Sequence, residues 1–195
     1  MSSLPTDAAQ LRQLLLDLLV THAYREGEFV LASGQTSPYY INCKPVILQP
    51  QGAWAVGHLL HQQLPVEAQA VAGLTLGADP LVSSVAVVSA PTDHPVAGLI
   101  IRKEPKGYGA RSQIEGPELP QNAVVVVVED VVTTGQSALK AVRVLRDVGY
   151  RVDQVMAVVD RQQGAAEVYA TEGLGFMALF TLPDLQACHA QRSVL

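Results

Sequence analysis

Hydrophobic residues recur with helical spacing in some segments of the chain and form short continuous runs in others. Near the start, Leu11, Leu15 and Leu18 follow the stripe of a helix with one buried face, predicted over residues 6–22. Further helices are predicted over residues 51–64, 79–89 and 134–148, and from Pro183 onwards. Apolar runs predict strands over residues 70–74, 96–101, 123–128, 152–159 and 175–180. This alternation of helices with continuously apolar strands indicates an α/β fold with a central, mostly parallel sheet flanked by helices.

Two stretches interrupt the alternation. Residues 28–48 mix short β-rich pieces with Ser-Gly and Ser-Pro pairs, which predicts short strands and loops that form a small hood. Residues 102–121 are polar and glycine-rich, which predicts a long loop. At about 150 residues per domain, the length of 195 residues predicts a single domain over residues 1–195.

Composition excludes several classes of protein. With 49% apolar and 16% charged residues, the chain is too apolar for intrinsic disorder. Its longest strictly apolar run, residues 123–128, is far shorter than the roughly 20 residues that cross a bilayer, so no membrane partner is expected. A formal net charge of −5 argues against a nucleic-acid partner. Cys43 and Cys188 form no disulfide framework and the first residues lack a secretory signal, which predicts a cytoplasmic location.

The basic residues are unevenly spread. None occurs between Lys44 and Arg102, and then Arg102, Lys103, Lys106 and Arg111 follow within ten residues. A solvated, exposed basic loop is the simplest interpretation of this cluster. A loop that meets an anion is the alternative, and the cluster alone does not decide between them.

The segment of residues 124–137 carries the strongest chemical signal. An apolar strand ends in Glu129 and Asp130, and a turn rich in Thr and Gly leads into a helix. The turn offers free N–H groups at the positive end of that helix, which suits a phosphate. The adjacent carboxylates suit the vicinal hydroxyls of a ribose, or a metal. The arrangement therefore predicts a site for a phosphorylated sugar, whereas an isolated Glu-Asp pair would be interpreted as solvated charge at a strand end.

The strand, the two acids and the Thr-Thr-Gly turn together resemble the hallmark of the type I phosphoribosyltransferases. Three further segments, residues 29–42, 102–109 and 159–164, resemble the N-terminal segment, the catalytic loop and the orotate-contacting segment of the orotate phosphoribosyltransferases. The resemblance covers roughly residues 6–180. It implies the type I phosphoribosyltransferase fold, with a hood built from about residues 24–48 and the C-terminal segment.

The resemblance also implies an activity. Members of the family transfer the 5-phosphoribosyl group from 5-phosphoribosyl 1-diphosphate (PRPP) to orotate, which gives orotidine 5′-phosphate and diphosphate in de novo pyrimidine biosynthesis. The reaction needs Mg²⁺, expected to be held mainly by PRPP rather than by a protein metal site. A homodimer is implied, in which the loop of residues 102–120 reaches the active site of the neighbouring subunit.

Residue roles carry over by position. The residues expected to bind PRPP are Leu76, Gly77, Glu129, Asp130, Val131, Val132, Thr133, Thr134, Gly135, Gln136 and Ser137. Those expected to bind orotate are Tyr39, Tyr40, Thr133 and Arg161, and those expected to act on the leaving diphosphate are Arg102, Lys103, Lys106 and Tyr108. Tyr39 and Tyr40 are adjacent in a predicted strand and so alternate faces, which allows at most one of them to stack on the base.

Three positions depart from the family pattern. Ala32, Gly77 and Tyr108 stand where many members carry Lys, Lys and His, so positive charge is missing from the predicted diphosphate site. The departures bear on the rate rather than on the substrate class. Two alternatives remain open from the residues: a purine-type transferase, which would leave Arg161 without a carboxylate to bind, and a regulator of the same fold that binds nucleotide or RNA.

Overall fold

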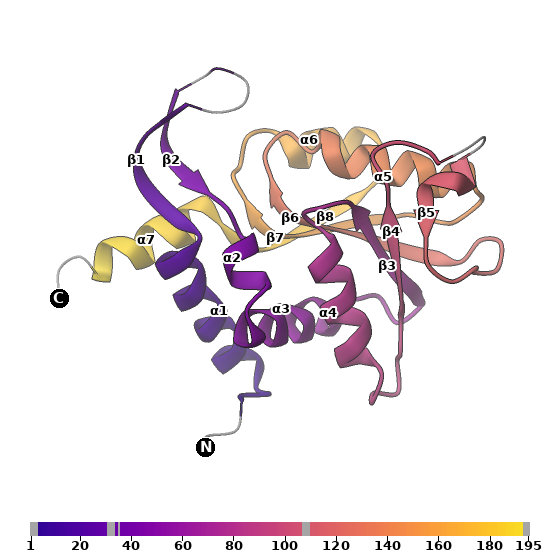
Figure 1. The fold of residues 1–195 in the computed structure, drawn as a ribbon, viewed down its shortest axis with the longest axis horizontal. Helices are drawn as coiled ribbons and strands as arrows, with labels where there is room; N and C mark the ends of the chain where they lie inside the picture. Colours follow the sequence, from indigo (N-terminus) through magenta and orange to yellow (C-terminus); the bar gives the residue numbers. More distant parts are fainter. Residues whose placement is uncertain (1–3, 31–33, 35, 107–109, 193–195) are drawn as a thin grey trace.

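A six-stranded sheet forms the centre of the computed structural model, which describes residues 4–30, 34, 36–106 and 110–192 (Figure 1). Its strands lie in the order β5-β4-β3-β6-β7-β8, and β5 alone is antiparallel to its neighbour. Their bounds are β3 (Ala68–Leu74), β4 (Ala97–Ile101), β5 (Ile114–Glu115), β6 (Val124–Val132), β7 (Gln154–Asp160) and β8 (Gly175–Thr181). The predicted mostly parallel sheet is confirmed.

Helices cover both faces of the sheet. On one face lie α1 (Ala8–His22), α2 (Lys44–Ile47), α3 (Pro50–Gln62), α4 (Asp79–Ser89) and α7 (Leu182–Arg192), and on the other lie α5 (Gln136–Asp147) and α6 (Ala165–Thr171). Strand β6 serves both cores, because Val126 and Val128 pack with the first group whereas Val125 and Val127 pack with the second. A strand buried on both faces favours a continuously apolar sequence, as β6 has from Val124 to Val128.

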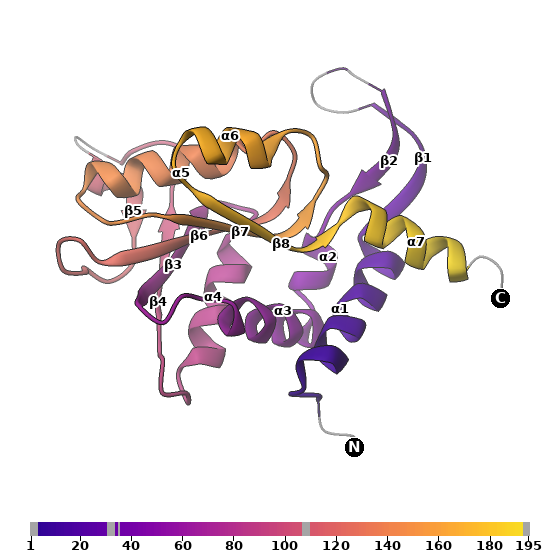
Figure 2. The same cartoon turned by 180° about the vertical axis from the view of Figure 1, so that it is seen from behind.

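A two-stranded antiparallel hairpin, β1 (Tyr24–Val30) and β2 (Thr36–Ile41), stands apart from the sheet (Figures 1 and 2). It leans on α7, where the rings of Tyr24 and His189 meet edge to face with centroids 5.4 Å apart. The N-terminal hairpin and the C-terminal helix therefore lie together at one end of the molecule.

The structure corrects several sequence-based boundaries. The predicted long loop contains a 3₁₀ turn (Ala110–Gln113) and β5, so residues 102–121 are not all loop. Helix α6 was missed because it is short and lies between Gly164 and Gly173, both at positive φ. Strand β6 continues to Val132, so Glu129 and Asp130 lie inside the strand rather than at its end. Its extra residues are held by pairing with β7, which reaches as far as Val132 opposite Asp160.

Topology fixes where a ligand would bind. Taken in chain order, the five parallel strands lie across the sheet as second, first, third, fourth and fifth. Strand order therefore reverses between β3 and β6, and in open α/β sheets ligands bind beyond the carboxyl ends of the strands at this switch point.

Within the described part of the chain, no helix is long and apolar enough to cross a membrane.

Candidate active site

Two strand-to-helix turns meet at the switch point. Strand β3 ends at Leu74 and leads through residues 75–78 into α4, and β6 leads through residues 133–135 into α5. The first turn lies against the end of β6, because a Cβ atom added to Gly77 would lie 2.6 Å from Oδ1 of Asp130. Any side chain at position 77 would displace the Asp130 carboxylate, which gives a structural reason for glycine at this position. Leu76, on the same turn, is 66% exposed.

The two carboxylates of β6 are buried but differ in their surroundings. Asp130 forms an ion pair with Lys44, whose Nζ lies 3.2 Å from Oδ2. Glu129 has no such partner, and its Oε2 is buried without a hydrogen bond from the described residues. Burial, together with repulsion from Asp130, raises the pKa of Glu129 to about 8, which the Lys44 ammonium only partly offsets. In the unliganded protein the protonated form of Glu129 is therefore favoured near neutral pH, and a positive charge on a bound sugar would favour the ionised form.

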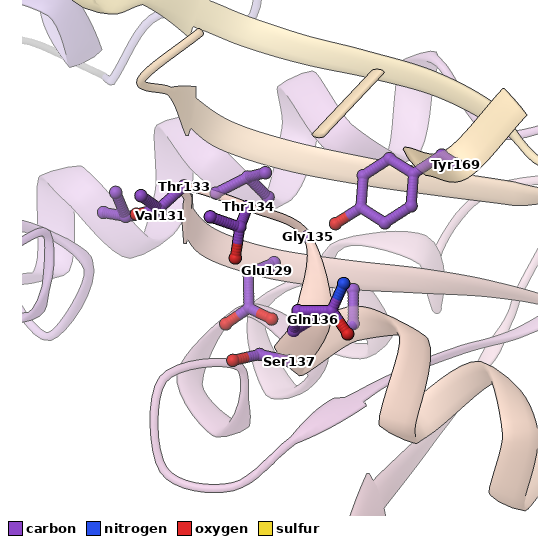
Figure 3. Close-up of a pocket in the computed structure, with 10 residues that line it drawn as sticks. Glu129, Val131, Thr133, Thr134, Gly135, Gln136, Ser137 and Tyr169 are labelled. Carbon is purple, nitrogen blue, oxygen red and sulfur yellow. The ribbon is translucent and has the colours of Figure 1, made fainter. Parts of the chain in front are cut away.

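The turn after β6 wraps a small cavity of about 90 Å³ (Figure 3). Its lining consists of Glu129, Val131, Val132, Thr133, Thr134, Gly135, Gln136, Ser137, Ala138 and Tyr169. Gly135 is left-handed, with φ of 80°, and it opens α5 without a side-chain cap from the described residues. The first N–H groups of α5 are thus available to a ligand, and an anion is the ligand that the positive end of a helix favours.

A second cluster lies at the end of β7. The guanidinium carbon of Arg161 sits 4.9 Å from the centre of the Tyr39 ring, and Nη1 lies 3.5 Å from Oγ1 of Thr133. Gln163 donates a hydrogen bond of 3.2 Å to the Tyr39 hydroxyl. Tyr40 lies outside this cluster, since it is 44% exposed and packs against Phe29 instead. Of the two adjacent tyrosines, the structure brings Tyr39 alone to Arg161, as the alternation of a strand requires.

The basic segment after β4 is held by one acidic residue. Arg102 and Lys106 both pair with Glu115 of β5, at 3.2 and 3.0 Å, and their hydrogen bonds lower the pKa of that carboxyl. Exposed pairs of this kind are weak, so they do not lock the segment in place. Lys103 lines a hollow beside Ser137, Lys140 and Arg143 of α5. Tyr108 and Ala32 lie outside the described residues.

Sequence reasoning missed two side chains of the site, Lys44 and Tyr169, and it gave no role to Gln163, although this residue lies in the predicted orotate-contacting segment. Lys44 had a signal, since it is the last basic residue before a long stretch without any. Tyr169 had none, because it belongs to the unpredicted helix α6 and reaches Gly135 only through the fold. Among the described residues, no group of three or more His, Cys, Asp or Glu side chains could hold a metal ion.

The fold, the phosphate-sized cavity and the paired carboxylates define a phosphoribosyltransferase. In agreement, residues 54–177 match the family described as the phosphoribosyl transferase domain. Among curated proteins, the chain is 62% identical to the orotate phosphoribosyltransferase of Nostoc sp. over 92% of this chain and 87% of that protein. It is 59% identical to the orotate phosphoribosyltransferase of Synechocystis sp. over 94% of this chain and 93% of that protein. The chain belongs to the orotate phosphoribosyltransferase family.

Solved structures agree with this assignment. The orotate phosphoribosyltransferase of Mycobacterium tuberculosis H37Rv superimposes with a TM-score of 0.78 at 35% identity, covering 90% of this chain and 98% of that one. A second structure of that enzyme, in complex with 5-phospho-alpha-D-ribosyl 1-diphosphate, gives a TM-score of 0.72 at 34% identity, covering 93% and 99%. The expected type I phosphoribosyltransferase fold is thus confirmed.

Proposed function

We propose that this protein transfers the 5-phosphoribosyl group from PRPP to orotate, which yields orotidine 5′-phosphate and diphosphate in pyrimidine biosynthesis. One observation carries the proposal: at the switch point, a phosphate-sized turn, two buried carboxylates and an arginine stacked on a tyrosine lie side by side. These three features match the three parts of the reacting complex, namely the phosphate, the ribose and an anionic aromatic base.

The donor is held by the turn and by the carboxylates. The 5′-phosphate lies at the start of α5, where N–H groups of the turn and the hydroxyls of Thr133, Thr134 and Ser137 can donate to it. Glu129 and Asp130 accept hydrogen bonds from the ribose hydroxyls. As the bond to diphosphate breaks, the sugar gains positive charge, and preorganised carboxylates in a buried site stabilise that charge strongly.

Orotate is recognised by Arg161. A planar guanidinium matches a carboxylate with two parallel hydrogen bonds, and the Nε of Arg161 is buried without a partner among the described residues. The ring of Tyr39 holds the guanidinium from one side and Gln163 holds Tyr39 from the other. A purine brings no carboxylate, so this pocket favours orotate.

The leaving diphosphate is stabilised by the basic loop. Arg102, Lys103 and Lys106 supply cations, and Arg102 and Lys106 can leave Glu115 at little cost because the pairs are exposed. Tyr108, by its place in the family pattern, donates a hydrogen bond without adding charge. A closed loop also keeps water from hydrolysing the donor.

The loop of residues 102–120 acts on the active site of a second subunit in a homodimer. An apolar groove of about 310 Å³ between α3 and α4, lined in part by Trp54 and Val88, supports this arrangement. Beside it Val87 is 72% exposed, and exposed apolar surface of this kind marks interfaces.

A magnesium ion fits the site as part of the donor. Within the described residues no three-ligand group exists, while the free Oε2 of Glu129 faces the space where the ribose hydroxyls lie. The ion would sit on the diphosphate and ribose oxygens and neutralise their charge.

The whole chain acts as one domain with the β1–β2 hairpin and α7 as its hood. Both cysteines are free thiols, which suits a cytoplasmic enzyme.

The test is diphosphate release from PRPP and Mg²⁺ in the presence of single bases. Orotate should support release, whereas uracil, which lacks the carboxylate, should support far less, and adenine and hypoxanthine none. Activity with a purine and none with orotate would overturn the proposal. No diphosphate release with any of the bases would favour a non-catalytic regulator of the same fold.

A further inference from the structure

The hydroxyl of Tyr169 is a buried donor without a partner. The residue is 0% exposed, and its ring packs against Phe176 with centroids 5.0 Å apart. Its ring also closes one side of the turn, since a Cβ atom at Gly135 would lie 2.9 Å from it. Packing explains the ring, but the hydroxyl finds no hydrogen bond among the described residues. Buried hydroxyls are nearly always satisfied, so this one calls for an explanation.

An unpartnered carboxyl oxygen belongs to the lining of the same cavity. Oε2 of Glu129 is also buried without a hydrogen bond, and Glu129 and Tyr169 both line the cavity of about 90 Å³ at the start of α5. Figure 3 shows the Tyr169 hydroxyl pointing toward the turn at Gly135, and in the same view the Glu129 carboxylate lies between Thr134 and Ser137. A hydroxyl donor, a carboxyl oxygen without a partner and the N–H groups of a helix end therefore belong to one small cavity.

The chemistry of the occupant follows from these groups. A phosphate monoester of a sugar offers oxygens that accept from a hydroxyl and from N–H groups, and sugar hydroxyls that donate to a carboxylate. Burial and the nearby carboxylates of Glu129 and Asp160 raise the pKa of Tyr169, so its hydroxyl remains a donor at any physiological pH. Water alone would satisfy both groups, but water would not use the helix end as an anion does.

We propose that the Tyr169 hydroxyl donates a hydrogen bond to the 5′-phosphate of the ribosyl substrate and so selects phosphorylated over unphosphorylated ribose. This inference rests on the proposed function for the identity of the ligand. It adds to that function a binding residue from α6, an element that no motif of the sequence marks.

The substitution Tyr169→Phe tests the role, because it removes the hydroxyl and keeps the ring between Gly135 and Phe176. A hydrogen bond to a charged group corresponds to about a tenfold change in affinity or somewhat more. We expect the KM for PRPP and the Kd for ribose 5-phosphate to rise about tenfold, with kcat within about twofold and the KM for orotate unchanged. Thermal melting without ligand should be unaltered or higher, since a buried unpartnered hydroxyl is lost.

Tyr150→Phe is the matched control. Tyr150 is also buried, at 5% exposed, but its hydroxyl accepts hydrogen bonds inside the protein, from Arg111 and from the backbone N–H of Leu119. Its loss should lower the melting temperature and leave the affinity for inorganic phosphate unchanged. Inorganic phosphate, titrated by calorimetry, is a probe that needs no turnover and should bind about tenfold more weakly to the Tyr169→Phe variant.

Two results separate the inference from the proposed function. If Tyr169→Phe binds phosphate and PRPP as tightly as the unaltered protein, or loses kcat with no change in the KM for PRPP, the role of Tyr169 is overturned. If the unaltered protein turns over no orotate, the proposed function fails, while the phosphate titration still decides whether Tyr169 contacts a phosphate.

Discussion

Replacing Glu129 by Gln should make the stability of the protein less sensitive to pH. The pKa of Glu129 is raised from 4.5 to about 8 in the folded protein. Between these two pH values the folded state therefore binds more protons than the unfolded state. The free energy of unfolding decreases over this range as the pH rises, until the pH passes the pKa of the folded state. At about 1.4 kcal/mol per pKa unit, the full loss attributable to this carboxyl is about 5 kcal/mol.

Roughly half of that loss, about 2.5 kcal/mol, is expected between about pH 6 and about pH 9. A glutamine has the same shape and no proton to lose, so the Glu129→Gln variant should keep this free energy. Urea unfolding of both proteins at several pH values measures the difference between them, in which the contributions of titrating groups remote from Glu129 cancel. The gap should widen in favour of the variant as the pH rises.

An exposed carboxyl provides the control. Glu167→Gln, on the solvent side of α6, should leave the pH profile of stability parallel to that of the unaltered protein. Parallel profiles for Glu129→Gln as well would refute the reasoning, because they would mean that burial and Asp130 do not raise the pKa of Glu129. The same variant should also lower kcat/KM for PRPP, since a neutral amide stabilises the charged ribosyl group less than a carboxylate.

Three further substitutions address the rest of the site. Arg161→Ala should raise the KM for orotate at least tenfold more than the KM for PRPP in steady-state assays, and an equal rise in both would contradict its role. Lys44→Met should lower the free energy of unfolding, measured in urea, by about 1–2 kcal/mol. The variant leaves Asp130 buried without its partner, and the loss is moderate because Lys44 is 39% exposed. An unchanged value would show that the ion pair contributes no stability. Gly135→Ala should cost about 2 kcal/mol or more and weaken PRPP binding, since a Cβ at positive φ meets the Tyr169 ring; a fully stable variant with normal PRPP affinity would disprove this.

The layers of the fold could be predicted from the sequence because the central parallel strands β3, β6 and β7 are buried on both faces along most of their length. Both faces of β6 are buried from Val125 to Val128, so a polar side chain would have no contact with water there. The apolar run in the sequence and the strand therefore coincide. The exception is the end of β6, where buried acids continue the strand. Hydropathy ends the strand at Val128, but pairing with β7 keeps the backbone of Glu129 and Asp130 in the ladder.

Only those parts of the candidate site that consist of consecutive residues could be predicted from the sequence. The turn of residues 133–137 and the Arg161 segment are local, and their neighbours could be named from the motif. Lys44 lies 86 residues before Asp130 in the sequence, and the fold brings the two side chains together. Tyr169 comes from a short helix after β7 and contacts Gly135. No sequence spacing predicts either contact. Gly77 is similar, because the reason for its missing side chain is the Asp130 carboxylate opposite.

We propose that the switch-point site joins a phosphoribosyl group to orotate. A competition experiment tests this most directly: the protein receives PRPP and Mg²⁺ with orotate, adenine and hypoxanthine together, and mass spectrometry identifies the nucleotide formed. We expect orotidine 5′-phosphate as the product, with diphosphate released in equal amount, and we expect this product to be lost with Arg161→Ala. A purine nucleotide as the product, or diphosphate released without any nucleotide, would contradict it.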